Sequence, residues 1–263
     1  MKKFNYISSA KRTLKIESDS IRAIANQLDS SFTKLCDAVM NTKGKFVIMG
    51  VGKSGHIAQK VSATLSSTGT TSIFIHPTEA AHGDIGMIDK KDIILLISNS
   101  GETDEIINII PSLKRHAKKI ASLTGSNKST IAKSADIKIE LKSKKEACPL
   151  DLAPTSSTTN ALAFGDALAI ALLEAKGFTK NDFASSHPAG KLGKKLITKV
   201  SDLMHKGSSV PKVKPDTVLD DALLEITKKN LGITLVTNKK KIVGIFTNYF
   251  FLVCYKSNAK IFL

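Results

Sequence analysis

A regular alternation of short β-rich runs with helical patterns constrains the fold of this chain more than any other feature. Apolar residues recur at helical spacing over residues 5–40, near 54–67, 103–116 and 128–134, and again at about 157–176. The β-rich runs between them are KFVIM (45–49), SIFIH (72–76), DIILLIS (92–98), KKIASL (118–123) and ADIKIEL (135–141). Strands separated by helices pair in parallel through right-handed crossovers. The sequence predicts a doubly wound α/β domain with a five-stranded parallel sheet over residues 1–195.

The composition favours a cytoplasmic protein that does not enter a membrane. No stretch of the 263 residues approaches the roughly 20 apolar residues that a membrane-spanning helix needs. The longest candidate, ALAFGDALAIALLEA, carries Asp166 near its middle, and the N-terminus lacks the apolar core of a secretory signal. Three widely spaced cysteines form neither a disulfide framework nor a zinc cluster. We expect Cys148 to be a small buried apolar residue.

A net charge of +16 raises the question of a nucleic-acid partner. The lysines are scattered along the chain in pairs, only 5% of the residues are aromatic, and Trp is absent. Few stacking platforms are therefore available for single-stranded nucleic acid. We expect no nucleic-acid partner, although a basic protein also attracts small phosphate esters.

The loops that follow the predicted strands are the expected location of the chemistry. In a doubly wound domain, ligands bind beyond the carboxyl ends of the strands. The loops there are GVGKSG (50–55), HPTEAAHGD (76–84), SNSGETDE (98–105) and TGSNKST (124–130). Three of the four are rich in Gly, Ser and Thr and lead into a predicted helix, whose first N–H groups can cradle an anion. Their convergence on one edge predicts a phosphate site.

GVGKSG combines two known phosphate-binding patterns but satisfies neither. A Walker loop needs a glycine five positions before Gly52, where this chain has Val47. A dinucleotide fingerprint expects an acidic residue at the end of the second strand, yet that strand ends in Ile75 and His76, with Glu79 the nearest acid. These departures favour a small phosphorylated metabolite, with Lys53 directed into the cradle.

Five segments together resemble a known family. They are GVGKSGHIAQKVSATLSSTGT, HPTEAAHGDIGM, ISNSGETDEI, KKEACPLDLAPTSSTTNALAFGDALA and SSHPAGKLGKKL. In this order and spacing they resemble the arabinose-5-phosphate isomerases, sugar isomerase (SIS) domain enzymes that supply the precursor of Kdo and related capsule sugars. The resemblance covers about residues 5–247 and implies interconversion of D-ribulose 5-phosphate and D-arabinose 5-phosphate without a redox cofactor. It also implies a homotetramer whose sites are completed by neighbouring subunits.

By resemblance, the catalytic positions are Lys53, Glu105, Glu146 and His187. Aldose–ketose isomerisation needs a base for the proton next to the carbonyl and a donor or cation for the developing oxyanion. Glu146 or Glu105 is the expected base, Lys53 the partner of the oxyanion or phosphate, and His187 the acid–base group of ring opening. The family's HPGGALG reads HPAGKLG here, so Ala189 restricts the loop that follows this histidine.

The resemblance also implies binding residues. The expected substrate contacts are Ser54, Gly69, Thr70, His82, Ser98, Ser100 and Thr103, and His76 matches a contact to a divalent metal such as zinc. Each position has an ordinary structural alternative. Lys53 can be a solvated helix-start lysine, Glu146 a solvated carboxylate, and His187 a partner of the backbone. Glu105 can complement a helix dipole, and without the resemblance Glu102 and Asp104 are equal candidates. Two further alternatives are a sugar-phosphate-binding SIS protein without catalysis and an inactive, truncated remnant.

The character of the sequence changes near residue 200. Residues 200–247 resemble the first half of a CBS pair, including its GIFT ending. The family continues with a second CBS motif, whereas this chain has Asn248 in place of the usual aspartate and an apolar run, YFFLVCY. We therefore predict a small, incomplete α+β CBS domain over residues 200–263 with an aberrant, truncated tail. Regulation by adenine nucleotides through this segment is not expected.

Overall fold

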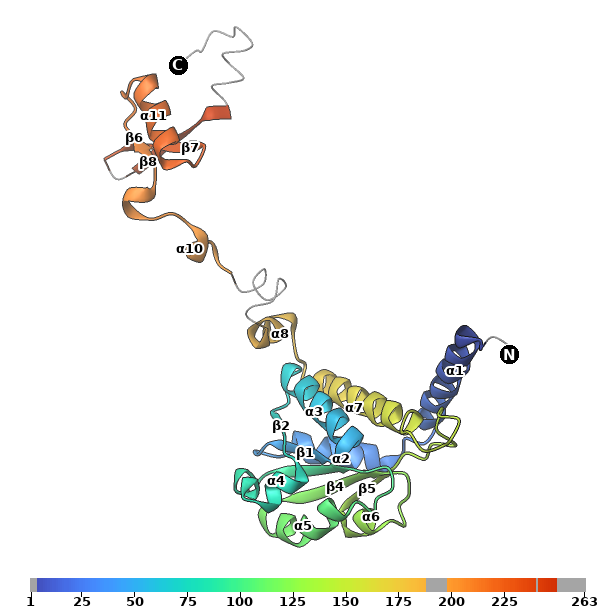
Figure 1. Cartoon of the computed structure of the whole chain (residues 1–263). Coiled ribbons are helices and arrows are strands. Elements are labelled where there is room, and N and C mark those ends of the chain that lie inside the picture. Colours follow the sequence, from blue (N-terminus) through green and yellow to red (C-terminus); the bar gives the residue numbers. More distant parts are fainter. Residues whose placement is uncertain (1–3, 188–197, 240, 250–263) are drawn as a thin grey trace. The chain divides into compact units, whose positions relative to one another are not determined.

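The computed structural model describes residues 4–187, 198–239 and 241–249. The chain divides into two compact units, Met1–Ile197 and Thr198–Leu263 (Figure 1). None of the helices in the described ranges is both long and apolar enough to cross a membrane.

The first unit is built on a five-stranded, fully parallel sheet. Its strands are β1 (Phe46–Gly50), β2 (Ser72–Phe74), β3 (Ile93–Ile97), β4 (Lys119–Thr124) and β5 (Ile137–Glu140). The strand order is β2-β1-β3-β4-β5, and every neighbouring pair runs parallel. The predicted doubly wound fold is confirmed. Each strand lies within the β-rich run that predicted it or extends one residue beyond the end of that run.

Helices cover both faces of this sheet (Figure 1). One face packs against α1 (Tyr6–Ala25), α2 (Ser30–Met40), α3 (Gly52–Ser67) and α7 (Ser156–Ala175). The other packs against α4 (Pro77–Ala81), α5 (Asp104–His116) and α6 (Thr130–Ser134), with the short 3₁₀ helix η1 (Asp84–Met87) beside α4. The helix α8 (Lys180–Ser186) follows α7. The helical pattern over residues 5–40 forms two helices, because the Asp29 carboxylate accepts from Ser31 N and caps a new one.

Alternate residues of the central strands supply two separate cores. Ile93, Leu95 and Ile97 of β3 enter the α3 and α7 side, while Ile94 and Leu96 enter the α5 side. All five are at most 2% exposed. Burying each side chain contributes about 2 kcal/mol, so the doubly covered strands need the continuous apolar runs seen in the sequence.

A buried carboxylate ties the starts of β1 and β3 together. Asp92 is fully buried and accepts hydrogen bonds from Lys45 N (2.6 Å) and Asp89 N (2.8 Å). It also pairs with the Lys45 ammonium, 2.8 Å away. Burial raises the pKa of Asp92, but the bonds from Asp89 and Lys45 outweigh burial and hold the pKa below its ordinary value.

Asp92→Ala is expected to destabilise the protein by about 3 kcal/mol at neutral pH, because two N–H groups and a partly buried ammonium lose their acceptor. Because the folded-state pKa is depressed, the stabilisation is present above the ordinary aspartate pKa and is lost as pH falls through the folded-state value. Chemical denaturation of both proteins from pH 7 downward measures the difference. Asp166→Ala, which removes an exposed pair with Lys60, is the control and should cost under about 1 kcal/mol. If both variants lost the same free energy of unfolding at pH 7, Asp92 would not be the stabilising link between β1 and β3.

The second unit is a small α+β segment. It contains α10 (Val200–Leu203), the 3₁₀ helix η2 (Gly207–Ser209), β6 (Lys212–Val213), α11 (Leu219–Lys229), β7 (Ile233–Asn238) and β8 (Lys241–Thr247). The sheet order is β6-β7-β8, with β6 parallel and β8 antiparallel to β7. The expected strand–helix–strand pattern is present in this segment. The predicted aberrant tail beyond Tyr249 lies outside the described residues.

Candidate active site

The strand order identifies one edge of the sheet as the candidate site. The chain moves from β1 outward to β2 and then returns to β3 on the other side of β1. At such a reversal the loops after the two central strands diverge and leave a crevice at their carboxyl ends, where ligands of doubly wound domains bind. Here these loops are the ones after Gly50 and Ile97.

The loop after β1 brings a bare helix N-terminus to this crevice. Gly52 has φ +58°, which L side chains rarely adopt, and it begins α3. A Cβ on Gly55 would approach Gly50 O to 2.7 Å, so glycine lets α3 start directly against the end of β1. The N-cap residue, Val51, has no side-chain cap. The first N–H groups of α3 are therefore available to an anion, and Lys53 and Ser54 lie in this first turn.

The loop after β3 gathers three hydroxyl groups. Ser98 Oγ lies 2.7 Å from Thr103 Oγ1 and 3.4 Å from Ser100 Oγ. Ser98 is buried and accepts from Gly101 N, while Ser100 accepts from Glu102 N. Thr103 is the N-cap of α5, but its side chain makes no cap hydrogen bond. We call Ser98, Ser100 and Thr103 the hydroxyl cluster. Its position at a second helix N-terminus suits an anion with several oxygens.

Glu105 and Glu146 occupy different environments. Glu105 is exposed in the first turn of α5, where its charge complements the helix dipole. Glu146 is half-buried, and its Oε2 accepts from Thr155 N (2.7 Å), Thr155 Oγ1 (3.0 Å) and Ser157 N (3.3 Å) at the start of α7. Burial raises the pKa of Glu146, but hydrogen bonds from Ser157 and Thr155 outweigh burial and lower the pKa from its ordinary value. Glu146 is therefore ionised at neutral pH.

A small cavity of about 50 Å³ links these elements. It lies between the N-termini of α3 and α7 and the carboxyl ends of β3 and β4. Its polar lining comes from Ser54, Asn99, Thr124, Ser157 and Thr158. Ser54 thus shares a cavity with Ser157, whose N–H holds Glu146. Asn99 and Thr124 lie in two of the loops predicted to hold the site, although neither residue was singled out there, and Ser157 and Thr158 were not predicted as site residues. Their position directly after a strand or in the first turn of a helix is the signal that identifies them.

Three predicted positions lie elsewhere. Gly69 and Thr70 precede β2, at the amino edge of the sheet, and contact the end of α7 through Lys176 Nζ (2.8 Å to Gly69 O, 2.7 Å to Thr70 Oγ1). The helix α3 separates this edge from Lys53 by 16 residues, or about 24 Å. His187 ends α8, which lies beside the C-terminal ends of α3 and α7 in Figure 1. Within one chain, these three residues do not join the hydroxyl cluster.

His187 already has partners on its own helix. Its ring stacks on Phe183 at 4.0 Å, and its Nδ1 lies 3.0 Å from Phe183 O. The contact with Phe183 O is the backbone hydrogen bond that was the structural alternative to a catalytic role for His187. The role of His187 in ring opening stays a prediction.

Within the described residues of one chain, the histidines after β2 do not gather into a metal site. His76 Nδ1 accepts from Thr78 N (3.2 Å) and thereby caps α4, while His82 ends the same helix. Metal at Nδ1 would displace the cap, and metal at Nε2 would require a proton on Nδ1, facing the N–H of Thr78. Among the residues that the structure describes, no group of three His, Cys, Asp or Glu side chains could hold an ion. This donor set does not fit a divalent metal.

The expectation for Cys148 is wrong. The residue is only half-buried, in the loop between Glu146 and α7. Hydrogen bonding from the backbone of Ala153, Leu152 and Leu150 lowers the pKa of the Cys148 thiol from its ordinary value. The loop curls back because Asp151 accepts from Glu146 N and itself has φ +55°. The prolines in this loop, Pro149 and Pro154, predict a turn but do not predict that the backbone curls around Cys148.

Comparisons with known proteins agree with the geometry. The SIS domain family matches residues 39–171. The arabinose 5-phosphate isomerase KdsD of Salmonella typhi is 51% identical over 246 residues, which span 93% of this chain and 75% of the relative. The chain belongs to the arabinose 5-phosphate isomerase family. Its Pseudomonas aeruginosa member is 49% identical over 245 residues, with the same two coverages.

A solved structure also resembles this chain. It is the E. coli CFT073 protein c3406 in complex with arabinose 5-phosphate, with a TM-score of 0.68 and 45% identity over 70% of this chain and 100% of that chain. The neighbour NanR of Vibrio vulnificus, complexed with ManNAc-6P, is 20% identical with a TM-score of 0.57 and shares the fold alone.

Replacing Ser98 and Thr103 together by Ala is expected to weaken binding of inorganic phosphate at this edge by tenfold or more, because two hydroxyl donors to the anion are lost (about 1.5 kcal/mol or more). Calorimetric titration measures the affinity, and Ser66→Ala, a hydroxyl near β2, is the matched control. An unchanged phosphate affinity in the double variant would refute the role of the hydroxyl cluster.

Proposed function

We propose that this protein is an aldose–ketose isomerase that interconverts D-ribulose 5-phosphate and D-arabinose 5-phosphate. The observation that carries the proposal is a pair of helix N-termini and a hydroxyl cluster at the β1/β3 crevice, with an anchored carboxylate at the start of α7. The relatives that share about half of its residues are named for this activity. The product would supply the synthesis of Kdo, as the family resemblance implies.

The phosphate of the pentose is the group best suited to the hydroxyl cluster. The first N–H groups of α5 and the hydroxyls of Ser98, Ser100 and Thr103 provide donors for several phosphate oxygens. The N-terminus of α3, with Ser54 and Lys53, can meet the remaining negative charge. Binding the distant phosphate tightly orients the reacting carbons without any bond to them.

The reaction itself is a proton transfer between two neighbouring carbons. A carboxylate removes the proton from C2 of the open aldose; the C–H electrons form the C1=C2 bond, and the carbonyl electrons move to O1. The carboxylic acid so formed returns this proton to the enediolate at C1, while the proton of O2 passes to O1, so that O2 becomes the ketone oxygen and O1 a hydroxyl. No electron leaves the substrate, so we propose that the enzyme needs no redox cofactor. The histidine chemistry above gives no support for a resident metal.

Of the two candidate bases, the surroundings favour Glu146. All three of its hydrogen bonds with the described residues fall on Oε2, which leaves Oε1 for a substrate proton. The lowered pKa keeps the group ionised, as a base must be. Glu105 is exposed in the first turn of α5, where its charge stabilises the helix N-terminus. When a phosphate binds there, the Glu105 carboxylate would have to turn away from it, so this residue is less suited to act as the base. Lys53 is the candidate for stabilising the oxyanion.

We propose that ring opening uses His187 of a neighbouring subunit. Gly69, Thr70 and His187 belong to the other edge within one chain, so a single site would draw them from a second copy, as in the tetramer implied by the family resemblance. Sites that contain residues of two copies are consistent with closed symmetric oligomers. A sugar-phosphate-binding protein without catalysis is less well supported, because the NanR neighbour, complexed with ManNAc-6P, shares only the fold.

Glu146→Gln is expected to lower kcat by about a thousandfold, because the amide cannot accept the C2 proton, while KM changes little. Glu105→Gln should lower kcat by less than about tenfold, and Glu174→Gln, on the exposed end of α7, is the control. Interconversion of the two pentose phosphates is measured, together with uptake of deuterium from D2O at carbon. A thousandfold loss in Glu105→Gln with activity retained in Glu146→Gln would reverse the assignment.

Mixing two inactive variants tests the shared site. Lys53→Gln and His187→Ala should each be nearly inactive as pure proteins. Unfolded and refolded together in equal amounts, they should recover about one quarter of the wild-type activity, because random assembly unites an intact Lys53 with an intact His187 at that fraction of sites. No recovery in mixed oligomers that have formed, as judged by mass spectrometry, would assign both residues to one chain.

A further inference from the structure

The parallel sheet gathers lysines at the edge opposite the candidate active site. Lys43 and Lys45 precede β1, Lys90 and Lys91 precede β3, and Lys118 and Lys119 stand at the start of β4. Because β1, β3 and β4 are adjacent and parallel, their first residues share one edge. We call these six residues the basic band. Pairs that are scattered in the sequence are therefore neighbours in the fold.

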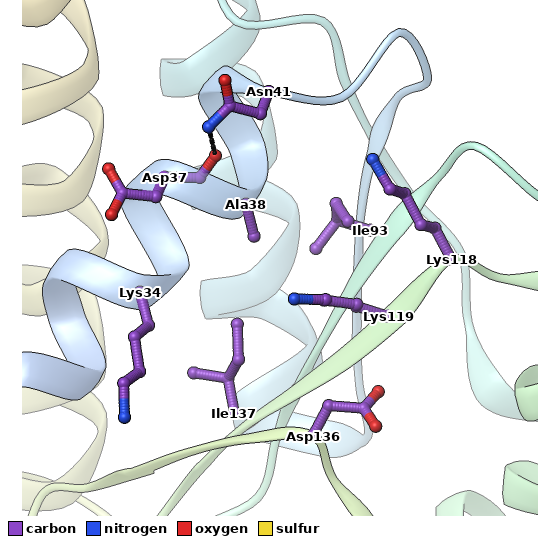
Figure 2. A pocket seen from close by; sticks show the side chains of 9 residues that line it. All are labelled: Lys34, Asp37, Ala38, Asn41, Ile93, Lys118, Lys119, Asp136 and Ile137. Carbon is purple, nitrogen blue, oxygen red and sulfur yellow. Dashed lines mark hydrogen bonds between the residues drawn. The ribbon is translucent and has the colours of Figure 1, made fainter.

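One end of the basic band borders a cavity of about 350 Å³ (Figure 2). The cavity lies between α2 and the starts of β3, β4 and β5, and its volume is within the range of small-molecule pockets. Ile93 and Ile137 provide apolar surface. In Figure 2 the side chain of Lys119 extends between these two residues toward α2, with Lys118 at one rim and Lys34 on the helix.

The lysines of this cavity have no anionic partner. In the described parts of the chain, ion pairs join Lys15 to Asp19, Lys45 to Asp92 and Lys60 to Asp166, and none includes Lys34, Lys118 or Lys119. The carboxylate of Asp136, at the start of β5, already accepts from Ile120 N (2.8 Å). Lys119 thus extends into the cavity, and Lys118 stands at its rim, without a counter-ion within salt-bridge distance.

The two sides of the cavity differ in charge. The β4 side carries Lys118 and Lys119, whereas the α2 side carries Asp37 and the end of the helix at Met40. A helix C-terminus has partial negative charge and repels an anion. Asn41, beyond that end, donates its amide to Asp37 O. An anionic group is therefore stabilised near β4, and hydroxyl or amino donors near α2.

We propose that this cavity binds a small phosphate ester, with its phosphate near Lys118 and Lys119 and its hydroxyl or amino groups toward the α2 side, where Asp37 and the helix C-terminus carry negative charge. The ester is either a sugar phosphate or a nucleotide, which share this chemistry. The site is separate from the hydroxyl cluster, because β3 runs five residues, about 17 Å, from one edge to the other. The inference stands independently of the proposed isomerase activity.

The test uses the full chain with Ser98→Ala and Thr103→Ala, so that the hydroxyl cluster does not contribute. The probes are inorganic phosphate, arabinose 5-phosphate and adenosine 5′-monophosphate, titrated calorimetrically at low ionic strength. We expect at least one of the two esters to bind at one site per chain and more tightly than inorganic phosphate. Tighter binding of arabinose 5-phosphate would identify the ligand as a sugar phosphate, and tighter binding of adenosine 5′-monophosphate would identify it as a nucleotide.

Three further variants locate the binding. Lys118→Gln with Lys119→Gln should weaken ester binding at least tenfold. Lys90→Gln with Lys91→Gln removes the same charge from the basic band outside the cavity and should weaken binding less than twofold. Asp37→Asn should reduce the preference for the ester over inorganic phosphate. Binding of neither ester, or equal weakening by both lysine pairs, would overturn the proposal. Thermal melting checks that each variant is folded.

Discussion

The pairing of β1 with β3 is the constraint on which the candidate site depends. Phe46 pairs with Ile93 and Gly50 with Ile97, so the two strands end together at the point where the chain reverses its direction across the sheet. The proposed binding of the phosphate follows from that register. It brings the glycine-built start of α3 and the hydroxyl cluster before α5 to one crevice. A carboxylate at the opposite end of the strands, Asp92, holds the same two strands in this register by binding Lys45 and Asp89.

Much of this arrangement was predictable because its causes are local. The five apolar runs and the helical patterns between them determine a parallel sheet, and residues that follow its strands must share an edge. Ser54, Ser98, Ser100 and Thr103 could be assigned to that edge without any structure. Val47 and the His76–Pro77 ending excluded a Walker loop and weakened a dinucleotide site on similar grounds. The family resemblance added the roles of Lys53 and Glu146, which spacing alone does not distinguish from solvated side chains.

What the sequence did not predict depends on contacts between distant segments. Ser157 and Thr158 line the cavity beside Ser54 because α7 packs along α3, where Gly165 meets Val61 so closely that a Cβ would be 2.2 Å away. The wrapping of Cys148 depends on a turn at Asp151 that no periodicity signals. Gly69, Thr70 and His187 match family positions, yet the fold of one chain separates them from Lys53, and only assembly could reunite them.

The single-oxygen attachment of Glu146 has a stereochemical consequence. Thr155 and Ser157 both donate to Oε2, so this oxygen fixes the carboxylate to the start of α7. The other oxygen, Oε1, therefore approaches the substrate from one side. A planar enediolate can be protonated at C2 from above or below, and the two outcomes are the C2 epimers arabinose and ribose 5-phosphate. In the proposed reaction, a base that approaches from one side only delivers the hydrogen to a single face, which is how one configuration is obtained from an intermediate that has none at that carbon.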